Sequence, residues 1–443
     1  MIWIELAIVL GCIVVGARLG GIGLGTMAGI GLVILVFIFG LPPGSPPAVV
    51  LGMIIAVITA LSAMQTAGGL DYMVMLAERA MKRKPEWITF VAPAVTYLFT
   101  LGAGTQHVVY ALLPIIAEVS RKAGIRPERP LSASVIASQR AITASPISAA
   151  TVAMVGMLVG SEYNLTDVLI ICLPATFLSS MAGALSVAWK GKALSEDPVY
   201  LEKLEKGDLE EAKEALKMSA KDEKRAMGAA LTFLLAIVVV VALGIYPRLR
   251  PEYEMVVGDT IKTAQLTMGQ AIMIIMIAVG GLIMLLFKAS PLKAMKGSVM
   301  RAGITAVISI LGISWMGSSF FEGNRVMIIE AISNTIQSYP WVFAIGLFTL
   351  SILLFSQAAT VVTLMPVGIA LGLPLPLLIA LFPATNGAFF LPTYGTILAA
   401  ISFDRTGTTK IGKYLLNHSF MLPGLVATVV SIVISLAIVG VFY

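Results

Sequence analysis

Long apolar runs alternate with short polar segments along the whole chain. About 20 apolar residues are needed to cross the roughly 30 Å hydrocarbon core of a bilayer. Runs that fit this requirement predict ten membrane-spanning helices, at residues 2–17, 21–40, 48–68, 131–157, 166–188, 227–246, 265–287, 302–320, 377–403 and 417–441. The hydrophobic pattern therefore predicts an all-α polytopic membrane protein.

Two further apolar stretches do not fit a single crossing. Residues 87–120 and 340–372 are too long for one transmembrane helix and too short for two. Small and polar residues interrupt each stretch near its middle, at 102–107 in the first and 356–360 in the second. We expect each stretch to enter the membrane and return to the same side, as a re-entrant hairpin.

The positions of the basic residues support this expectation. Short cytoplasmic loops of membrane proteins are enriched in Lys and Arg. Basic clusters at 79–84 and 121–129 flank the first stretch, so both of its ends are predicted to lie in the cytoplasm. The same rule puts the hairpin tip at 104–107 at membrane depth and both chain termini in the periplasm.

The two halves of the chain resemble each other. Trp87 and Pro114 in the first long stretch correspond to Trp341 and Pro366 in the second. Each half has five predicted spans. Because five is an odd number, the second half starts on the opposite side of the membrane from the first and is inverted relative to it. Inverted repeats with broken helices in matching positions are typical of secondary transporters.

These features predict three segments. Residues 1–188 form a first membrane repeat, and 227–443 form the inverted second repeat. Residues 189–226 are polar and are expected to form a cytoplasmic linker with a surface helix near 198–225. Within the repeats, span 131–157 is broken at 143–146, and span 377–403 is broken at 386–387 and 392–393.

Composition limits the possible functions. Hydrophobic residues make up 58% of the chain and charged residues 12%, with a mean hydropathy of +0.95. An ordinary soluble enzyme has roughly 45–50% apolar and about 25% charged residues. The chain contains two cysteines and two histidines, and it has no HExxH or Walker A motif. We therefore expect no enzyme activity, metal centre or cofactor, and we attribute the net charge of +6 to cytoplasmic loops rather than to nucleic-acid binding.

The polar residues at the breaks are the candidate substrate ligands. A broken helix exposes backbone N–H and C=O groups, which persist in a membrane where they line a cavity. Half-helix N-termini attract carboxylates, so breaks that converge from two inverted copies suit an elongated dianion. The neutral candidates are Thr105, Gln106, Thr143, Ser145, Ser148, Ser356, Gln357, Thr360, Thr385, Asn386 and Thr393. The alternative is that these hydroxyls cap the helix ends or bond to the preceding turn.

Two titratable residues join this set. Arg140 lies inside a predicted span, where a charge indicates function by default. It either faces a cavity and binds a carboxylate or extends its long side chain to the cytoplasmic surface. His107, at the hairpin tip, either donates to a carboxylate or carries a proton, or it bonds to the backbone as a neutral imidazole.

Several sequence motifs, distributed from one end of the chain to the other, resemble those of a known protein family. They lie at residues 16–22, 67–71, 125–130, 143–148, 356–359, 391–394 and 406–409. With these motifs the chain resembles the anaerobic C4-dicarboxylate transporter (Dcu) family, and segment 58–65 is more similar to its A-type branch. The resemblance implies an inner-membrane antiporter that exchanges fumarate, malate, aspartate and succinate.

The sequence leaves open other functions and the oligomeric state. A cation-coupled dicarboxylate carrier, driven by sodium ions or protons, would have the same hydrophobic pattern. A membrane-embedded dicarboxylate receptor without flux would have it too. Gly21, Gly25 and Gly29 repeat at four-residue spacing, which indicates either close helix packing within the chain or a possible homodimer contact.

Overall fold

The computed structural model is predominantly helical, and the predicted all-α membrane class is confirmed. It describes residues 1–19, 22–46, 48–206, 219–257, 260–339, 341–354, 356–392, 394–412 and 416–443. The chain forms two compact units. Unit 1 comprises Met1–Tyr72, Pro146–Leu169 and Met218–Val326, and unit 2 comprises Met73–Ser145, Ile170–Lys217 and Met327–Tyr443. Each unit thus combines segments from both halves of the sequence.

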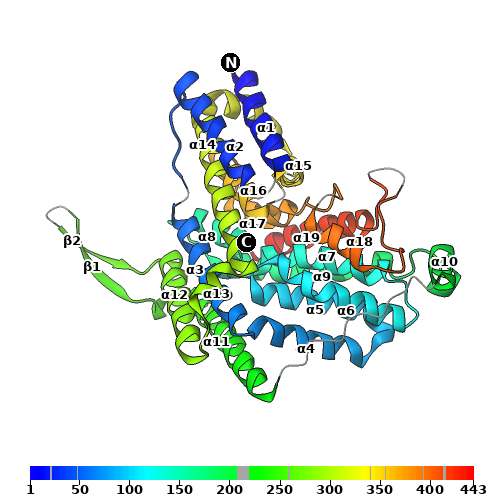
Figure 1. Ribbon diagram of the computed structural model, residues 1–443. Coiled ribbons are helices and arrows are strands. Elements are labelled where there is room, and N and C mark those ends of the chain that lie inside the picture. Colours follow the sequence, from blue (N-terminus) through cyan, green and yellow to red (C-terminus); the bar gives the residue numbers. More distant parts are fainter. Residues whose placement is uncertain are drawn as a thin grey trace. The chain divides into compact units, whose positions relative to one another are not determined.

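Unit 1 is a bundle of apolar helices (Figure 1). Within it α3 packs along α12, and α1 packs on α2. Its elements are α1 (Ile2–Leu19), α2 (Gly23–Val33), η1 (Ile34–Ile38), α3 (Ala48–Thr66), α8 (Ala149–Met157), α11 (Ala220–Ile245), η6 (Pro247–Leu249), α12 (Met268–Leu286), α13 (Pro291–Lys296) and most of α14 (Ser298–Ser338).

Glycine allows two helix backbones of unit 1 to meet. A Cβ atom added to Gly25 would lie 2.2 Å from the carbonyl oxygen of Ile308, and one added to Gly312 would lie 2.1 Å from that of Gly25. Nothing lies within 4 Å of such an atom at Gly29, and Gly21 lies outside the described residues. Gly25 therefore serves close packing of α2 on α14 within the chain.

Unit 1 also contains a β-hairpin that the hydrophobic pattern did not predict. Strands β1 (Glu252–Val257) and β2 (Thr260–Gln265) pair antiparallel, with Glu252 opposite Gln265. The hairpin connects α11 to α12 and extends beyond the ends of both helices (Figure 1). Its six-residue strands mix polar and apolar residues, so they lack the long apolar run that identifies a membrane span in a sequence.

Unit 2 contains the long hairpin stretches and most of the broken spans. Its elements are most of α4 (Gly69–Arg83), η2 (Pro85–Trp87), α5 (Ile88–Ala103), η3 (Gln106–Val108), α6 (Val109–Lys122), α7 (Glu128–Ala141), η4 (Ile142–Ala144), most of α9 (Leu165–Val187), η5 (Leu194–Glu196), α10 (Pro198–Glu205), α15 (Val342–Leu354), α16 (Gln357–Ala370), α17 (Leu375–Leu381), η7 (Phe382–Thr385), α18 (Gly395–Phe403) and α19 (Met421–Phe442). Helix α5 packs along α7, α18 packs on α6, and α19 contacts both α7 and α17.

Fewer helices are long enough to cross a membrane than the ten predicted spans. Among the described residues, six qualify by length and composition, or seven if the bent pair α3 and α4 counts as one span. The six are Pro85–Ala103, Leu165–Val187, Lys221–Ile245, Met268–Leu286, Val299–Met327 and Met421–Phe442. Of the remaining predicted spans, 131–157 and 377–403 are interrupted at their polar breaks, 2–17 and 21–40 contain shorter apolar helices, and 48–68 contains α3 of the bent pair.

Both long stretches fold as two helices separated by a break. Gly104, with φ +67°, ends α5, and α6 then begins at Val109. Helix α6 has 14 residues, and α15 and α16 have 13 and 14. At about 1.5 Å per residue each is roughly 20 Å long, which is short of the roughly 30 Å hydrocarbon core.

Two segments near the predicted cytoplasmic surface differ from expectation. The basic cluster at 79–84, interpreted as a loop, lies largely in helix α4, whose Ala77 and Met81 are buried one turn apart. The linker does not form one helix over 198–225. Helix α10 ends at Glu205, Ser219 is extended and caps α11, and residues 207–218 lie outside the described residues. A serine N-cap starts a new helix because its hydroxyl accepts the bond of an otherwise unpaired N–H group.

Candidate functional site

Helical structure is interrupted at four places in or next to unit 2. Helix α5 ends at Gly104, and α16 begins after Ser356. Helix α7 ends in η4 and is followed by Ser145, which is extended. Helix α17 continues as η7, residues 386–392 are non-helical, and α18 begins at Gly395.

Hydrogen bonds within unit 2 connect these interruptions in pairs. Ser145 Oγ donates to the carbonyl oxygen of Leu101, at 2.7 Å, and so connects the end of α7 to the end of α5. The Gln106 amide bonds to the hydroxyl of Tyr394, which precedes α18. Gln357 Nε2 donates to the carbonyl oxygen of Gln139 at 2.8 Å. The first residues of α16 therefore contact the end of α7.

Among the described residues, Arg140 is the largest side chain that is fully buried. Its Nη1 donates to the carbonyl oxygen of Pro383 at 2.8 Å and to Ser431 Oγ at 3.3 Å, and its Nη2 donates to Thr428 Oγ1. The side chain thus connects α7 to η7 and α19 instead of extending to the surface. A cation beside the last carbonyls of a helix is favourable, because the helix dipole is negative there.

The charge of Arg140 has no protein counter-ion among the described residues. No carboxylate oxygen of these residues lies within 4 Å of the guanidinium, and Arg140 Nε is buried without a hydrogen-bond partner. An uncompensated charge is expensive to bury, so an anion next to this group would be strongly stabilised. The guanidinium therefore crosslinks α7, η7 and α19, and its charge is chemically able to pair with an anion.

Three buried amides surround the same helix ends. The Gln357 amide nitrogen bonds to Asn386 Oδ1 as well as to the backbone of Gln139. Both side-chain amide atoms of Gln139 lack a hydrogen-bond partner, as does Gln357 Oε1, although the exposed fraction of Gln139 is 1%. Unpaired buried amides are rare in folded proteins and require an explanation. A polar ligand is one such explanation.

We call Gln139, Arg140, Gln357 and Asn386 the buried polar cluster. Three of its members were predicted from the sequence, and Gln139 was not. A signal for Gln139 does exist, because helix α7 carries Ser, Gln and Arg on all sides and is nevertheless buried along nearly its whole length. Polar side chains that lie inside a membrane protein indicate a functional interior.

The predicted hydroxyl ligands bond mostly to nearby backbone. Thr143, Thr360 and Thr385 each donate to a carbonyl oxygen three or four residues earlier. Ser148 accepts from the N–H of Thr151 and Ser356 from that of Ala359, so these two serines are N-caps. The structure thus favours the capping interpretation for these five residues.

Thr105, His107 and Thr393 were predicted as ligands but are not members of the buried polar cluster. Thr105 is half-buried at the break between α5 and η3. His107 lies in η3, but its side chain lies outside the described part, as does the whole of Thr393. Ser148 belongs to unit 1, whereas the buried polar cluster belongs to unit 2.

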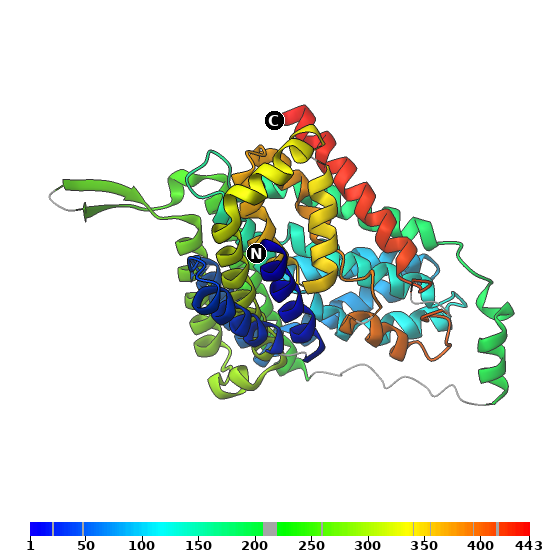
Figure 2. The ribbon, with the colours of Figure 1, turned by 90° about the horizontal axis from the view of Figure 1, so that it is seen from above.

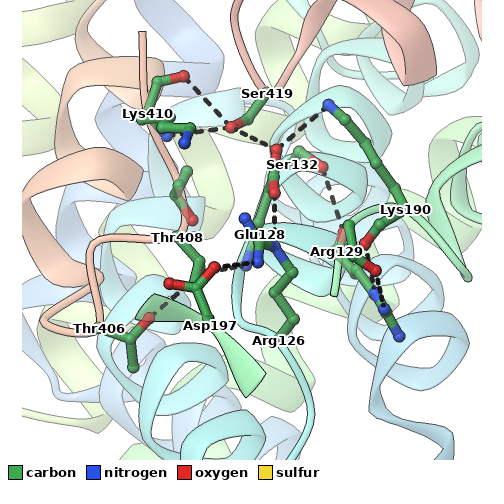
Figure 3. A network of polar contacts seen from close by, with 12 residues as sticks. Arg126, Glu128, Arg129, Ser132, Lys190, Asp197, Thr406, Thr408, Lys410 and Ser419 are labelled. Carbon is green, nitrogen blue, oxygen red and sulfur yellow. Dashed lines mark hydrogen bonds and ion pairs between the residues drawn. The ribbon is translucent and has the colours of Figure 1, made fainter. Parts of the chain in front are cut away.

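A second polar network lies where the loops of unit 2 meet the start of α7. Arg126 Nε donates to Glu128 Oε2 at 2.8 Å, and its Nη1 binds Asp197 (Figure 3). Lys190 Nζ lies 3.2 Å from Glu128 Oε1, and Ser419 Oγ donates to the same oxygen at 2.8 Å. The network ties together the loops before α7, after α9 and before α19.

Helix α10 is held at the edge of this network. Asp197 caps the helix by accepting from the N–H groups of Val199 and Tyr200. Lys203 Nζ donates to the carbonyl oxygen of Arg405 at 3.0 Å. Figures 1 and 2 show α10 beside the loop that follows α18. The start of the linker is therefore fixed to unit 2.

The charges of the network favour ionised carboxylates. Burial alone raises the pKa of Glu128, but the charge of Lys190 and the bonds from Arg126 and Ser419 bring it below its usual range. For Asp197, burial is likewise opposed by Arg126 and by two backbone N–H groups, so its pKa is also lowered. Both groups stabilise the fold as anions above pH 4 or so, and this contribution is lost as the pH falls through the lowered pKa values.

The whole sequence matches a known family of membrane proteins. Residues 1–443 match the family described as anaerobic C4-dicarboxylate membrane transporter. The chain belongs to this transporter family. It is 41% identical over 428 residues to the C4-dicarboxylate transporter DcuA of Escherichia coli strain K12, covering 96% of each chain. Membership of this family makes the protein a multi-pass membrane protein.

Relatives from both branches of the transporter family are about equally similar. The DcuA protein of Wolinella succinogenes is 40% identical over 433 residues, covering 98% of each chain. The anaerobic C4-dicarboxylate transporter DcuB of Escherichia coli O6:H1 is 40% identical over 438 residues, covering 97% of this chain and 96% of its own. The closer similarity to the A-type branch stays a prediction.

Solved structures of distant transporters share the fold. The YdaH transporter of Alcanivorax borkumensis has a TM-score of 0.60 at 14% identity, covering 89% of this chain and 85% of its own. MtrF of Neisseria gonorrhoeae has a TM-score of 0.50 at 13% identity, covering 93% and 84%. At these identities the likeness extends to the fold alone.

Proposed function

We propose that this protein exchanges C4-dicarboxylates, such as fumarate, malate, aspartate and succinate, across the bacterial inner membrane by alternating access. The family and its DcuA and DcuB relatives carry this substrate class in their names. The single observation that supports it within the molecule is the guanidinium of Arg140, which is buried at the chain breaks without a carboxylate partner among the described residues.

In this proposal the buried polar cluster holds one carboxylate of the substrate. Arg140 supplies the positive charge and its unpaired Nε–H group, and Gln139 supplies an amide N–H without a partner. Charge-assisted hydrogen bonds of this kind are roughly twice as strong as neutral ones. Thr105, Gln106, His107 and Thr393 remain candidates for the second carboxylate, and the capping hydroxyls keep the broken ends in place.

Counterflow in proteoliposomes tests the proposal. Vesicles loaded with unlabelled succinate are expected to accumulate labelled fumarate from a sodium-free medium at equal pH on both sides. Empty vesicles with the same protein should accumulate at least tenfold less, because exchange requires a substrate on the inner side. The measurement is the initial rate of label uptake with and without internal dicarboxylate.

The same assay separates the other functions. Uptake into empty vesicles that requires a sodium or proton gradient would contradict exchange and indicate a cation-coupled carrier. Fumarate binding to the detergent-solubilised protein, without flux into either set of vesicles, would indicate a receptor. Protein-free vesicles loaded with succinate are the control for leakage.

We further propose that both termini are periplasmic and that 87–120 and 340–372 are re-entrant hairpins that enter from the cytoplasm and the periplasm, respectively. The shortness of α6, α15 and α16 supports this arrangement, whereas Pro85–Ala103 alone is long enough to cross. Single cysteines at Lys84 and Lys122 are expected to react with a membrane-impermeant maleimide only from the cytoplasmic face. Labelling of the two positions from opposite faces would contradict the hairpin and make α5 a span.

A further inference from the structure

We infer that unit 2 carries a binding site for an anionic phospholipid, in a groove between α4 and the start of α5. The groove has a volume of about 550 Å³ and is lined by Leu76, Arg79, Ala80, Arg83, Lys84 and Val91. Its volume lies within the roughly 300–1,000 Å³ of small-ligand sites. This inference concerns a site separate from the buried polar cluster.

The groove combines positive charge with an apolar wall. Arg79 and Arg83 are exposed one turn apart on α4, and Lys84 follows directly. The carboxylate of Glu78, which belongs to the same helix, pairs with Lys82, and neither residue lines the groove. The lining thus presents three basic side chains beside three apolar ones. A ligand that satisfies both parts has an anionic group joined to a hydrocarbon chain.

The position of the groove along the chain favours a lipid as that ligand. Val91 lies in the first turn of α5, and Pro85–Ala103 is apolar enough to cross a membrane. Trp87, whose side chain is 57% exposed, stands at the start of the same helix. Tryptophan is enriched where membrane helices meet the headgroups. The groove therefore lies at the depth of the lipid phosphates.

An apolar path for an acyl chain continues from the groove. Val91 and Val95 are half-buried, and Leu98 is 59% exposed. Residues spaced by four and three positions share one face of a helix, so these three side chains form a stripe along α5. The phosphate would contact the basic residues of α4 while a lipid tail lies along this stripe. A free phosphate or a dicarboxylate has no group to fill this apolar part.

Lipid binding to the full-length protein in neutral detergent tests the inference. Native mass spectrometry with added phosphatidylglycerol or phosphatidylcholine gives the affinity for each lipid. Each basic residue near an anionic lipid contributes a factor of about five in affinity. We expect the wild type to prefer phosphatidylglycerol by at least tenfold. The triple variant R79Q/R83Q/K84Q should lose this preference, and R83Q alone should reduce the affinity for phosphatidylglycerol about fivefold.

Matched variants and competitors keep the test decisive. K82Q removes a basic residue of α4 that does not line the groove and should keep the full preference. Excess glycerol phosphate or succinate should not displace the lipid. Equal binding of both lipids to the wild type, or an unchanged preference in R83Q and the triple variant, would overturn the inference. Displacement by succinate would make the groove a site for small anions instead.

Discussion

Arg140→Gln is expected to reduce dicarboxylate exchange at least a hundredfold. The substitution removes the only charge of the buried polar cluster and the guanidinium bonds to Pro383 and Thr428. A hydrogen bond to a charged group is worth about 1.5–3 kcal/mol, and each 1.4 kcal/mol or so is a factor of ten. Arg140→Lys keeps the charge but loses the planar guanidinium with its paired N–H donors, so it should reduce the exchange rate about tenfold. The measurement is the counterflow rate at low fumarate concentration.

A selectivity profile distinguishes a ligand from a crosslink. If Arg140 binds a carboxylate, Arg140→Gln should weaken competition by succinate more than competition by a monocarboxylate of similar length. Ser431→Ala is the matched control, because it removes one acceptor at 3.3 Å and leaves the charge in place. This variant should keep both the rate, within about threefold, and the selectivity. A well-folded Arg140→Gln protein with an unchanged selectivity ratio would reduce Arg140 to a structural role.

Arg126→Met is expected to lower the free energy of unfolding by about 3–5 kcal/mol. The exposed fractions of the Arg126, Glu128 and Asp197 side chains are 7%, 5% and 9%. Removing the guanidinium leaves two buried carboxylates, one of which retains only Lys190 as its ion-pair partner. Breaking a buried ion pair is costly because the remaining charge is neither hydrated nor neutralised. The melting temperature of the purified protein in detergent measures the loss.

Two controls accompany this variant. Lys206→Gln removes the partner of Glu202 from a pair that is exposed on both sides and screened by solvent, so this variant should melt at the same temperature as the wild type. The second control uses pH. The pKa values of Glu128 and Asp197 are lowered by the fold, so the difference between Arg126→Met and the wild type should shrink as the pH falls below about 4. A difference that stays constant with pH would mean that lost packing, and not charge, causes the effect.

Much of the site could be predicted from residue type and spacing. Gln357 and Asn386 are candidates from the sequence because polar groups at helix breaks are expensive in a membrane unless they line a polar interior. Arg140 is a candidate because a charge inside a predicted span indicates function. The hydroxyl residues were recognised too, but Thr143 and Thr385 bond to their own turns. A threonine that binds substrate and a threonine that caps a turn can occupy the same kind of position at a helix break. The hydrophobic pattern therefore cannot distinguish the two roles.

The sequence by itself determined the helical membrane class, the family and the places where the helices break, because these depend on local composition and on ordered motifs. Only the tertiary structure decided which breaks meet. The partners of Arg140 lie 243 to 291 residues away along the chain, and Gln357 reaches back 218 residues to Gln139. The tertiary structure also decided that the basic cluster at 79–84 belongs mainly to an amphipathic helix beside α5 and not to a loop. Such contacts follow from how the helices pack, and hydrophobic periodicity records which residues are apolar but not which helix each of them faces.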